Sequence, residues 1–197
     1  LSEYRRGKQL ASLDLRNCKA LQGAHNHQNA CAAYAAVRTL GIGPRSVEKA
    51  LKSFTGLAHR SQLVTELSGV VFINDSKATN VDSAMKALET FAKVRWICGG
   101  EQKEEDISRL NNVLTNVEKA YVIGTDAAKF SSQISCEFEI CNTMDVAVKK
   151  AFNDAKDGET VLLAPAAASF DQFRNFEDRG NRFKEIINEQ LNESLIK

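Results

Sequence analysis

From residue 58 onward, short apolar runs alternate with amphipathic segments. Such runs are typical of strands buried on both faces of a parallel sheet, and the segments between them space their apolar residues at helical intervals. The alternation therefore predicts an α/β fold, with a mostly parallel sheet flanked by helices. The apolar runs lie at 69–76, 94–100, 119–124, 138–141 and 160–165, and the amphipathic segments at 81–91, 106–114, 126–134, 145–155 and 183–191.

Residues 1–57 follow a different pattern. The segment 26–40 is rich in alanine and favours a helix, and the segment 44–54 places a proline in its first turn and apolar residues along one face. Neither expected helix has a sheet to cover, because the first residues of the chain are too polar to supply one. We therefore expect 1–57 to be the end of a domain that begins upstream, and 58–197 to form a second domain.

Composition narrows the function classes. The 197 residues carry a formal net charge of +1 and no dense run of lysine and arginine, so a general nucleic-acid binder is not indicated. Five cysteines form an odd set without a C-x-x-C pair, which predicts reduced thiols in a cytoplasmic protein rather than a disulfide framework or a zinc ribbon. No apolar run approaches the roughly 20 residues that a membrane span requires, and no metal site is predicted within the chain.

Ligands of parallel α/β sheets collect at the carboxyl ends of the strands. The candidate residues therefore follow the apolar runs: Asn74–Thr79, Gly99–Lys103, Gly124–Asp126, Asn142 and Pro165–Asp171. The first group sets an anion, Asp75, close to a cation, Lys77. This pair fits either a solvated ion pair or a site in which Asp75 accepts ribose hydroxyls and Lys77 neutralises a phosphate or carboxylate. Thr79 fits the cap of the following helix.

Lys103 follows the glycine pair Gly99-Gly100 at the end of the next apolar run. The pair is a weak signal, because it also fits a flexible turn with an exposed lysine. The chain lacks both the G-x-G-x-x-G fingerprint and the G-x-x-x-x-G-K-[ST] phosphate loop.

Two earlier stretches add polar candidates. Asn26 and Asn29 share one face at the start of the first expected helix, where they fit either capping or recognition of a purine edge. His59 and Arg60 stand at the expected domain junction, where they fit either an ordinary surface or a ligand site between domains.

The segment 162–183 passes from a buried strand through a proline and a run of alanines to a strongly polar stretch. The small residues at 166–168 let the backbone bend closely past a ligand and expose Ser169 at the sheet edge. Ser169 fits either a partner for a carboxylate or the cap of a helix that starts near Phe170. Phe176, at the following turn, fits both core packing and a backbone contact with substrate.

Five elements stand in a defined order along the chain: "HNHQN", "HR", "NDSKATN", the glycine pair followed by Lys103, and "LLAPAAASFDQFRNFEDRGNRF". Together, over residues 20–190, they resemble the carboxy-terminal part of the bacterial Mur ligase family. The first elements are similar to those of folylpolyglutamate synthase as well, whereas the last resembles the D-glutamate-adding branch. The family has three domains, so the resemblance implies a Rossmann-like carboxy-terminal domain preceded by a helical remnant of a central ATP-binding domain.

The resemblance implies an ATP-dependent ligase of peptidoglycan precursor synthesis. ATP phosphorylates the alanine carboxylate of UDP-N-acetylmuramoyl-L-alanine, and the amine of D-glutamate attacks the acyl phosphate. Mg²⁺ is the implied companion of ATP, with its ligands mainly upstream of these residues. The positions similar to those that hold D-glutamate, of which the two lysines are also the catalytic candidates, are Lys77, Thr79, Lys103, Ser169 and Phe176. The positions similar to those that hold ATP are Asn26, Asn29, His59, Arg60 and Asp75.

The alternative is a non-catalytic α/β module that binds a nucleotide or an amino acid, or another relative of the Mur ligases and folylpolyglutamate synthase. Because the phosphate loop and metal ligands that the resemblance implies are not among these residues, we expect the chain alone not to catalyse ligation. Its expected partners are its own N-terminal and central domains and the small-molecule substrates, with no nucleic acid and no membrane.

Overall fold

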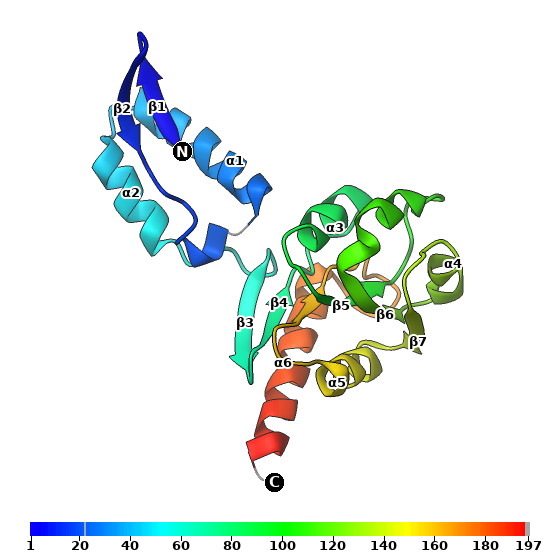
Figure 1. Ribbon diagram of the computed structural model, residues 1–197. Helices are drawn as coiled ribbons and strands as arrows, with labels where there is room; N and C mark the ends of the chain where they lie inside the picture. The colour runs from blue at the N-terminus through cyan, green and yellow to red at the C-terminus, as the bar shows by residue number, and fades with distance from the viewer. Residues whose placement is uncertain (22, 196–197) are drawn as a thin grey trace. The chain divides into compact units, whose positions relative to one another are not determined.

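The computed structural model describes residues 1–21 and 23–195. The chain forms two compact units, Leu1–Gly56 and Leu57–Lys197 (Figure 1). The N-terminal unit combines a β-hairpin with two α-helices. Its elements are β1 (Ser2–Arg5), β2 (Lys8–Ser12), the 3-10 helix η1 (Lys19–Leu21), α1 (Ala24–Thr39) and α2 (Pro44–Ser53).

The hairpin of β1 and β2 is a feature that the sequence pattern did not predict. Its strands are largely exposed, so they need no apolar run. The turn between them places Arg6 at φ 50° and Gly7 at φ 77°, and two positive φ values in succession match the right-handed twist of the flanking strands. The Arg-Gly step was therefore the one local signal for this hairpin.

The two expected helices of the N-terminal unit are present as α1 and α2. Tyr34 of α1 and Val47 of α2 are buried together with Leu13, which follows the hairpin. An open cavity of about 420 Å³ lies beside both helices, and its lining includes Val37 and Phe54. The apolar side of this helix pair is thus only partly covered within the unit.

The C-terminal unit is built on a six-stranded sheet in the order β3-β4-β8-β5-β6-β7. Only β3 runs antiparallel to its neighbour, and the other pairs are parallel. The expectation of a mostly parallel α/β sheet is confirmed. The strands are β3 (Gln62–Leu67), β4 (Val70–Asn74), β5 (Val94–Gly99), β6 (Val117–Ile123), β7 (Phe138–Asn142) and β8 (Thr160–Leu163), and the helices are α3 (Val81–Leu88), the 3-10 helix η2 (Ser108–Asn116), α4 (Ala127–Ser131), α5 (Met144–Asp154) and α6 (Phe176–Leu195).

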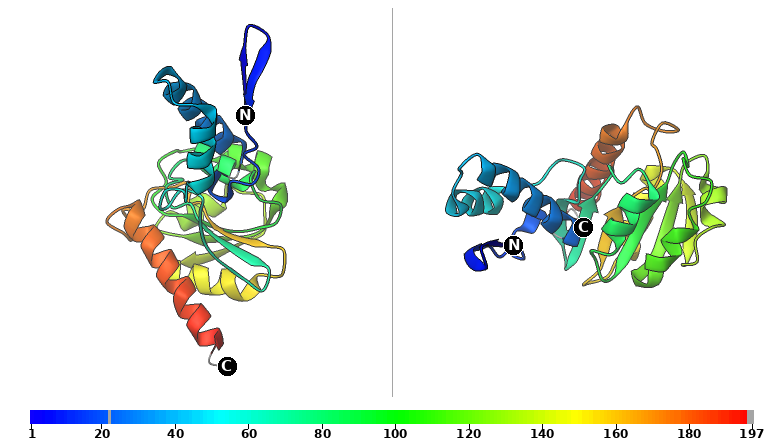
Figure 2. Two further views of the ribbon diagram at one scale, coloured as in Figure 1. Left: turned by 90° about the vertical axis from the view of Figure 1, so that its left-hand side faces the viewer. Right: turned by 90° about the horizontal axis from the view of Figure 1, so that it is seen from above.

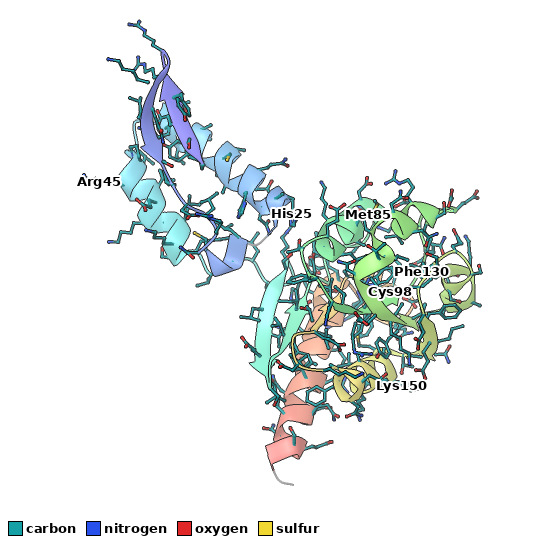
Figure 3. All side chains as sticks on the ribbon, viewed as in Figure 1. His25, Arg45, Met85, Cys98, Phe130 and Lys150 are labelled. Carbon is teal, nitrogen blue, oxygen red and sulfur yellow. The ribbon has the colours of Figure 1, made fainter. Side chains whose placement is uncertain are left out.

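Helices cover both faces of this sheet (Figure 2). Side chains of a strand alternate between faces, so Trp96 of β5 packs with α3, η2 and α4 while its neighbour Ile97 packs with α5 and α6. Met85, Cys98 and Phe130, labelled in Figure 3, belong to the first of these two cores. Burial on both faces explains why the central strands read as continuous apolar runs.

Two elements differ from the sequence expectation. The segment expected as a helix at 106–114 forms a 3-10 helix, Ser108–Asn116, instead of an α-helix. The strand β3 was missed because its residues are exposed or half-buried, as suits an edge strand, and form no apolar run. Within the described residues, no helix combines the length and the apolar character that crossing a membrane requires.

Candidate functional site

The loops that follow β4, β5 and β8 are joined to one another by backbone hydrogen bonds. The N–H of Ala166 donates to the carbonyl of Ala78 at 2.9 Å, which joins the loop after β8 to the loop after β4. Ala168 and Glu101 exchange two further bonds of 2.9 and 3.1 Å, which join the same turn to the loop after β5. The segments that carry Lys77, Lys103 and Ser169 are thereby brought to one edge of the sheet.

The alanine turn at 166–168 is bare because its neighbours leave no room for larger side chains. All three alanines are buried, and Ala166 adopts a positive φ of 55°. On the facing loop, Gly100 has φ 134°, and a Cβ there would run into the carbonyl oxygen of Ala168. Small residues on both sides thus permit the backbones to pair directly.

Arg179 of α6 links the loops at this edge of the sheet through hydrogen bonds, and the sequence analysis did not identify it. Its side chain is 1% exposed and donates five hydrogen bonds of 3.0–3.2 Å to oxygens of Ser76, Ala167 and Ala168. None of these acceptors is a carboxylate, and burial lowers the pKa of Arg179 to about 10. The sequence could have indicated that Arg179 is buried, because it lies four residues before Phe183 and therefore on the buried face of the helix.

The solvated ion pair considered for Asp75 and Lys77 does not form. The Lys77 ammonium lies 3.9 Å from the centroid of the Phe176 ring. The Asp75 carboxylate accepts a hydrogen bond of 3.4 Å from the Ser61 hydroxyl. Burial raises the pKa of the Asp75 carboxyl to about 6, which marks a carboxylate with few compensating partners.

The capping interpretations of Thr79 and Ser169 are wrong. Asn80 is the N-cap of α3 and accepts from the N–H of Ser83 at 2.9 Å, so Thr79 precedes the cap. No helix starts near Phe170, and the N–H groups that follow Ser169 donate to its carbonyl oxygen rather than to its hydroxyl. The expectation that the alanine turn exposes Ser169 is also wrong, because the residue is only 3% exposed, and its hydroxyl makes no hydrogen bond within the described part of the chain. The Thr79 hydroxyl likewise makes no hydrogen bond to the described residues.

His59 is buried, in contrast to the exposed Arg60 beside it. The ring nitrogen Nδ1 of His59 accepts from the Asn74 side chain at 3.1 Å, and the same amide donates to the carbonyl of Gly180 at 3.0 Å. The His59 ring also meets the edge of Phe176, with centroids 6.1 Å apart. Burial lowers the pKa of His59. These contacts make His59 a support of the sheet edge, and a contact with ATP stays a prediction.

Asn26 and Asn29 belong to the N-terminal unit. Because α1 begins at Ala24 and its N-cap is Gly23, both asparagines lie inside the helix and neither caps it. Asn29 is exposed at the rim of the cavity beside α1 and α2. Their expected part in purine recognition stays a prediction.

Among residues 1–21 and 23–195, no group of three histidine, cysteine, aspartate or glutamate side chains is placed to hold a metal ion. Mg²⁺ is commonly held by only one or two carboxylates together with substrate phosphates, so such a group is not a requirement for binding it.

Comparison with known proteins decides the family. Residues 59–167, more than half of the chain, match the family described as "Mur ligase, glutamate ligase domain". The chain belongs to the Mur ligase family. The resemblance noted from the sequence motifs is thereby confirmed.

Relatives of this Mur ligase chain are closely similar in sequence. It is 58% identical over 191 residues to the UDP-N-acetylmuramoylalanine--D-glutamate ligase of Ruegeria pomeroyi, covering 97% of this chain and 41% of that protein. It is 60% identical over 188 residues to the ligase of the same name from Cereibacter sphaeroides, covering 95% of this chain and 40% of that protein. The chain thus spans about two fifths of the length of these curated relatives.

Solved structures share the fold of this Mur ligase chain. The bifunctional folylpolyglutamate synthase/dihydrofolate synthase of Yersinia pestis superposes with a TM-score of 0.65 at 19% identity, over 94% of this chain and 43% of that one. The MurF ligase of Thermotoga maritima in complex with ADP gives 0.63 at 18% identity, over 87% and 40%. These likenesses support the Rossmann-like α/β assignment.

Proposed function

We propose that this Mur ligase chain supplies the D-glutamate-binding residues, and part of the ATP-binding residues, of a longer cytoplasmic ligase that adds D-glutamate to UDP-N-acetylmuramoyl-L-alanine during peptidoglycan precursor synthesis. In this proposal residues 1–57 end the central ATP-binding domain, and 58–197 form the domain that brings the amino acid. The names and the 58–60% identity of the relatives support the choice of substrate.

The proposal rests on polar side chains that have no hydrogen-bonding partner within the described part of the protein and that lie on the three joined loops after β4, β5 and β8. The side chains of Lys77, Thr79, Lys103 and Ser169 make no hydrogen bond or ion pair to other described residues. Two ammonium groups and two hydroxyls suit a ligand with two carboxylates, because charge-assisted hydrogen bonds are the strong ones. D-glutamate has that chemistry.

The ammonium and hydroxyl groups of these side chains indicate how each would bind D-glutamate. Lys77 and Lys103 neutralise the carboxylates of D-glutamate, and the hydroxyls of Thr79 and Ser169 donate to them and fix their orientation. The amine is then held toward the acyl phosphate, and such positioning contributes up to roughly 7 to 11 kcal/mol in favourable cases.

Asp75 and Arg60 have the chemistry of a nucleotide contact. The Asp75 carboxyl has a single weak side-chain partner and suits ribose hydroxyls, and the neighbouring exposed Arg60 suits a phosphate or a stacked base. ATP supplies the phosphoryl group, and Mg²⁺ would be held mainly by groups outside this chain.

The test uses Ser169→Ala in the full-length ligase that contains this chain. Loss of one hydrogen bond to a carboxylate should lower kcat/KM for D-glutamate about 10- to 150-fold, while KM for ATP and Tm stay nearly unchanged. Ser132→Ala removes an exposed serine hydroxyl at the end of α4 and serves as the matched control. An unaltered kcat/KM for D-glutamate would remove Ser169 from the site.

A second measurement separates the ligase from a binding module. Phosphate release from ATP, UDP-N-acetylmuramoyl-L-alanine and D-glutamate is expected with the full-length protein and not with the 197-residue chain. If the full-length protein binds D-glutamate without releasing phosphate, the non-catalytic alternative is correct.

A further inference from the structure

The ammonium group of Lys77 lies over the aromatic ring of Phe176 in a cation–π contact. The 3.9 Å from Nζ to the ring centroid lies well inside the range in which a ring face attracts a cation. Within the described residues, the Lys77 side chain has no hydrogen bond and no ion pair. The ring is therefore the contact that sets where this ammonium stands.

Phe176 is itself held on two sides. Its carbonyl oxygen accepts a hydrogen bond of 2.7 Å from the Ser76 hydroxyl, which ties the start of α6 to the loop after β4. Its ring meets the His59 ring edge-on, with an interplanar angle of 81°. The carbonyl of His59 also accepts from the N–H of Lys77 at 3.0 Å, so His59 contacts both members of the pair.

We propose that Phe176 is a positioning residue for D-glutamate: its ring holds the Lys77 ammonium at the sheet edge, and His59 holds the ring. This inference rests on the proposed function and deepens it. A lysine has a flexible four-carbon stem, and ordering it when a ligand binds opposes binding. A lysine that already stands over a ring loses less freedom, so the ligand binds more tightly.

Two other roles for Phe176 predict different behaviour. Phe176 is half-buried and is not part of the core on the α5 and α6 face, whereas Phe183 is buried in that core and the half-buried Phe173 packs against it. A packing role predicts a loss of stability on removal of the ring. A contact of substrate with the Phe176 backbone predicts no effect of changing the ring, because the backbone remains.

The kinetic test compares three variants of the full-length ligase. Phe176→Leu keeps apolar bulk and removes the π face, and it should raise KM for D-glutamate about five- to thirtyfold with kcat and KM for ATP changed less than about twofold. Phe176→Tyr restores the π face and should stay within about threefold of wild type. Phe173→Leu is the matched control, a ring removed three residues away, and should lower Tm without changing KM for D-glutamate.

An independent measurement uses the 197-residue chain. The ring current of Phe176 should shift the Hε resonances of Lys77 upfield in a carbon–proton NMR spectrum, and Lys77→Met assigns the signal by its disappearance. Phe176→Leu should return the signal to the position of the exposed lysines.

The two ways of failing are distinct. If the wild-type full-length protein shows no D-glutamate-dependent phosphate release, the proposed function is wrong. An unshifted Lys77 signal, or an unchanged KM for D-glutamate in Phe176→Leu of an active enzyme, overturns the positioning role while leaving the proposed function intact.

Discussion

Replacing Asp75 with asparagine should change how the stability of the chain depends on pH. Burial raises the pKa of the Asp75 carboxyl to about 6 in the folded state, against 3.8 for the unperturbed side chain. Asparagine has nearly the same shape and can still accept the Ser61 hydroxyl, but it does not ionise. The substitution therefore isolates the free energy of burying the charge.

The magnitude follows from the two pKa values. Their difference, 6 − 3.8, is about 2 units, and at 1.36 kcal/mol per unit it corresponds to about 3 kcal/mol. Because the folded pKa is the higher one, the folded state binds the proton more tightly. The Asp75 contribution to stability is thus fully present below about pH 4, declines between about pH 4 and 6, and is lost above that range.

The assay is urea unfolding of the wild-type chain and Asp75→Asn from about pH 4 to 8, followed by fluorescence of Trp96, a core residue of the C-terminal unit. The difference in unfolding free energy between the two proteins should grow by about 3 kcal/mol in favour of asparagine as the pH rises. Other titrating groups are common to both proteins and cancel in this difference.

Asp157→Asn is the matched control, because Asp157 is an exposed aspartate at the opposite end of β4. It measures the effect of replacing an exposed carboxyl with an amide, and the difference for Asp75→Asn is compared with it at each pH. If the unfolding free energies of wild type and Asp75→Asn change with pH in the same way, ionisation of Asp75 does not destabilise the folded state. That result would argue against a carboxylate that is buried without partners so that it can bind a ligand.

Three further substitutions test the architecture of the edge. Arg179→Met should destabilise the C-terminal unit by about 3 kcal/mol or more in urea unfolding, because buried oxygens of neighbouring residues lose their hydrogen-bond donors. A loss under about 1 kcal/mol would contradict the stabilising role given to these hydrogen bonds. Gly180→Ala should lower the unfolding free energy by about 2 kcal/mol, because the added Cβ meets the ring of His59, and a neutral effect in the same assay would show that the ring can move aside. Asn80→Ala should cost about 1 kcal/mol through loss of the α3 cap and leave KM for D-glutamate unchanged, whereas a raised KM would place Asn80 in the site.

Hydrophobic patterning was sufficient to identify five of the six strands of the C-terminal unit and the positions of its helices. Strands buried on both faces must be continuously apolar, and four of the five expected runs correspond to the largely buried strands β4, β5, β6 and β8. The fifth run corresponds to β7, an edge strand with exposed residues. Patterning failed at three other strands whose burial is partial. The edge strand β3 and the hairpin of β1 and β2 have exposed faces, so their composition does not separate them from loops.

The grouping of the candidate residues at one edge of the sheet could also be predicted from the sequence, because strand ends of a parallel sheet share one edge. The state of each side chain could not. Asp75 and Lys77 are two residues apart, which suggests an ion pair, yet the carboxylate turns to Ser61 and the ammonium to Phe176. Ser61 comes from another loop and Phe176 from α6, and only the packing of α6 against the sheet edge brings the ring of Phe176 to the lysine.

What the sequence by itself determined is the set of chemistry-bearing residues and the order of the elements that carry them, because both depend on local composition and periodicity. What only the tertiary structure decided is which polar groups are engaged within the protein and which are left for a ligand. Arg179 shows the reason: its five hydrogen bonds go to oxygens 11 to 103 residues away, and no local pattern encodes contacts of that separation. By holding Ser76 and the alanine turn, it orders the loops on which the hydroxyl of Ser169 stays free.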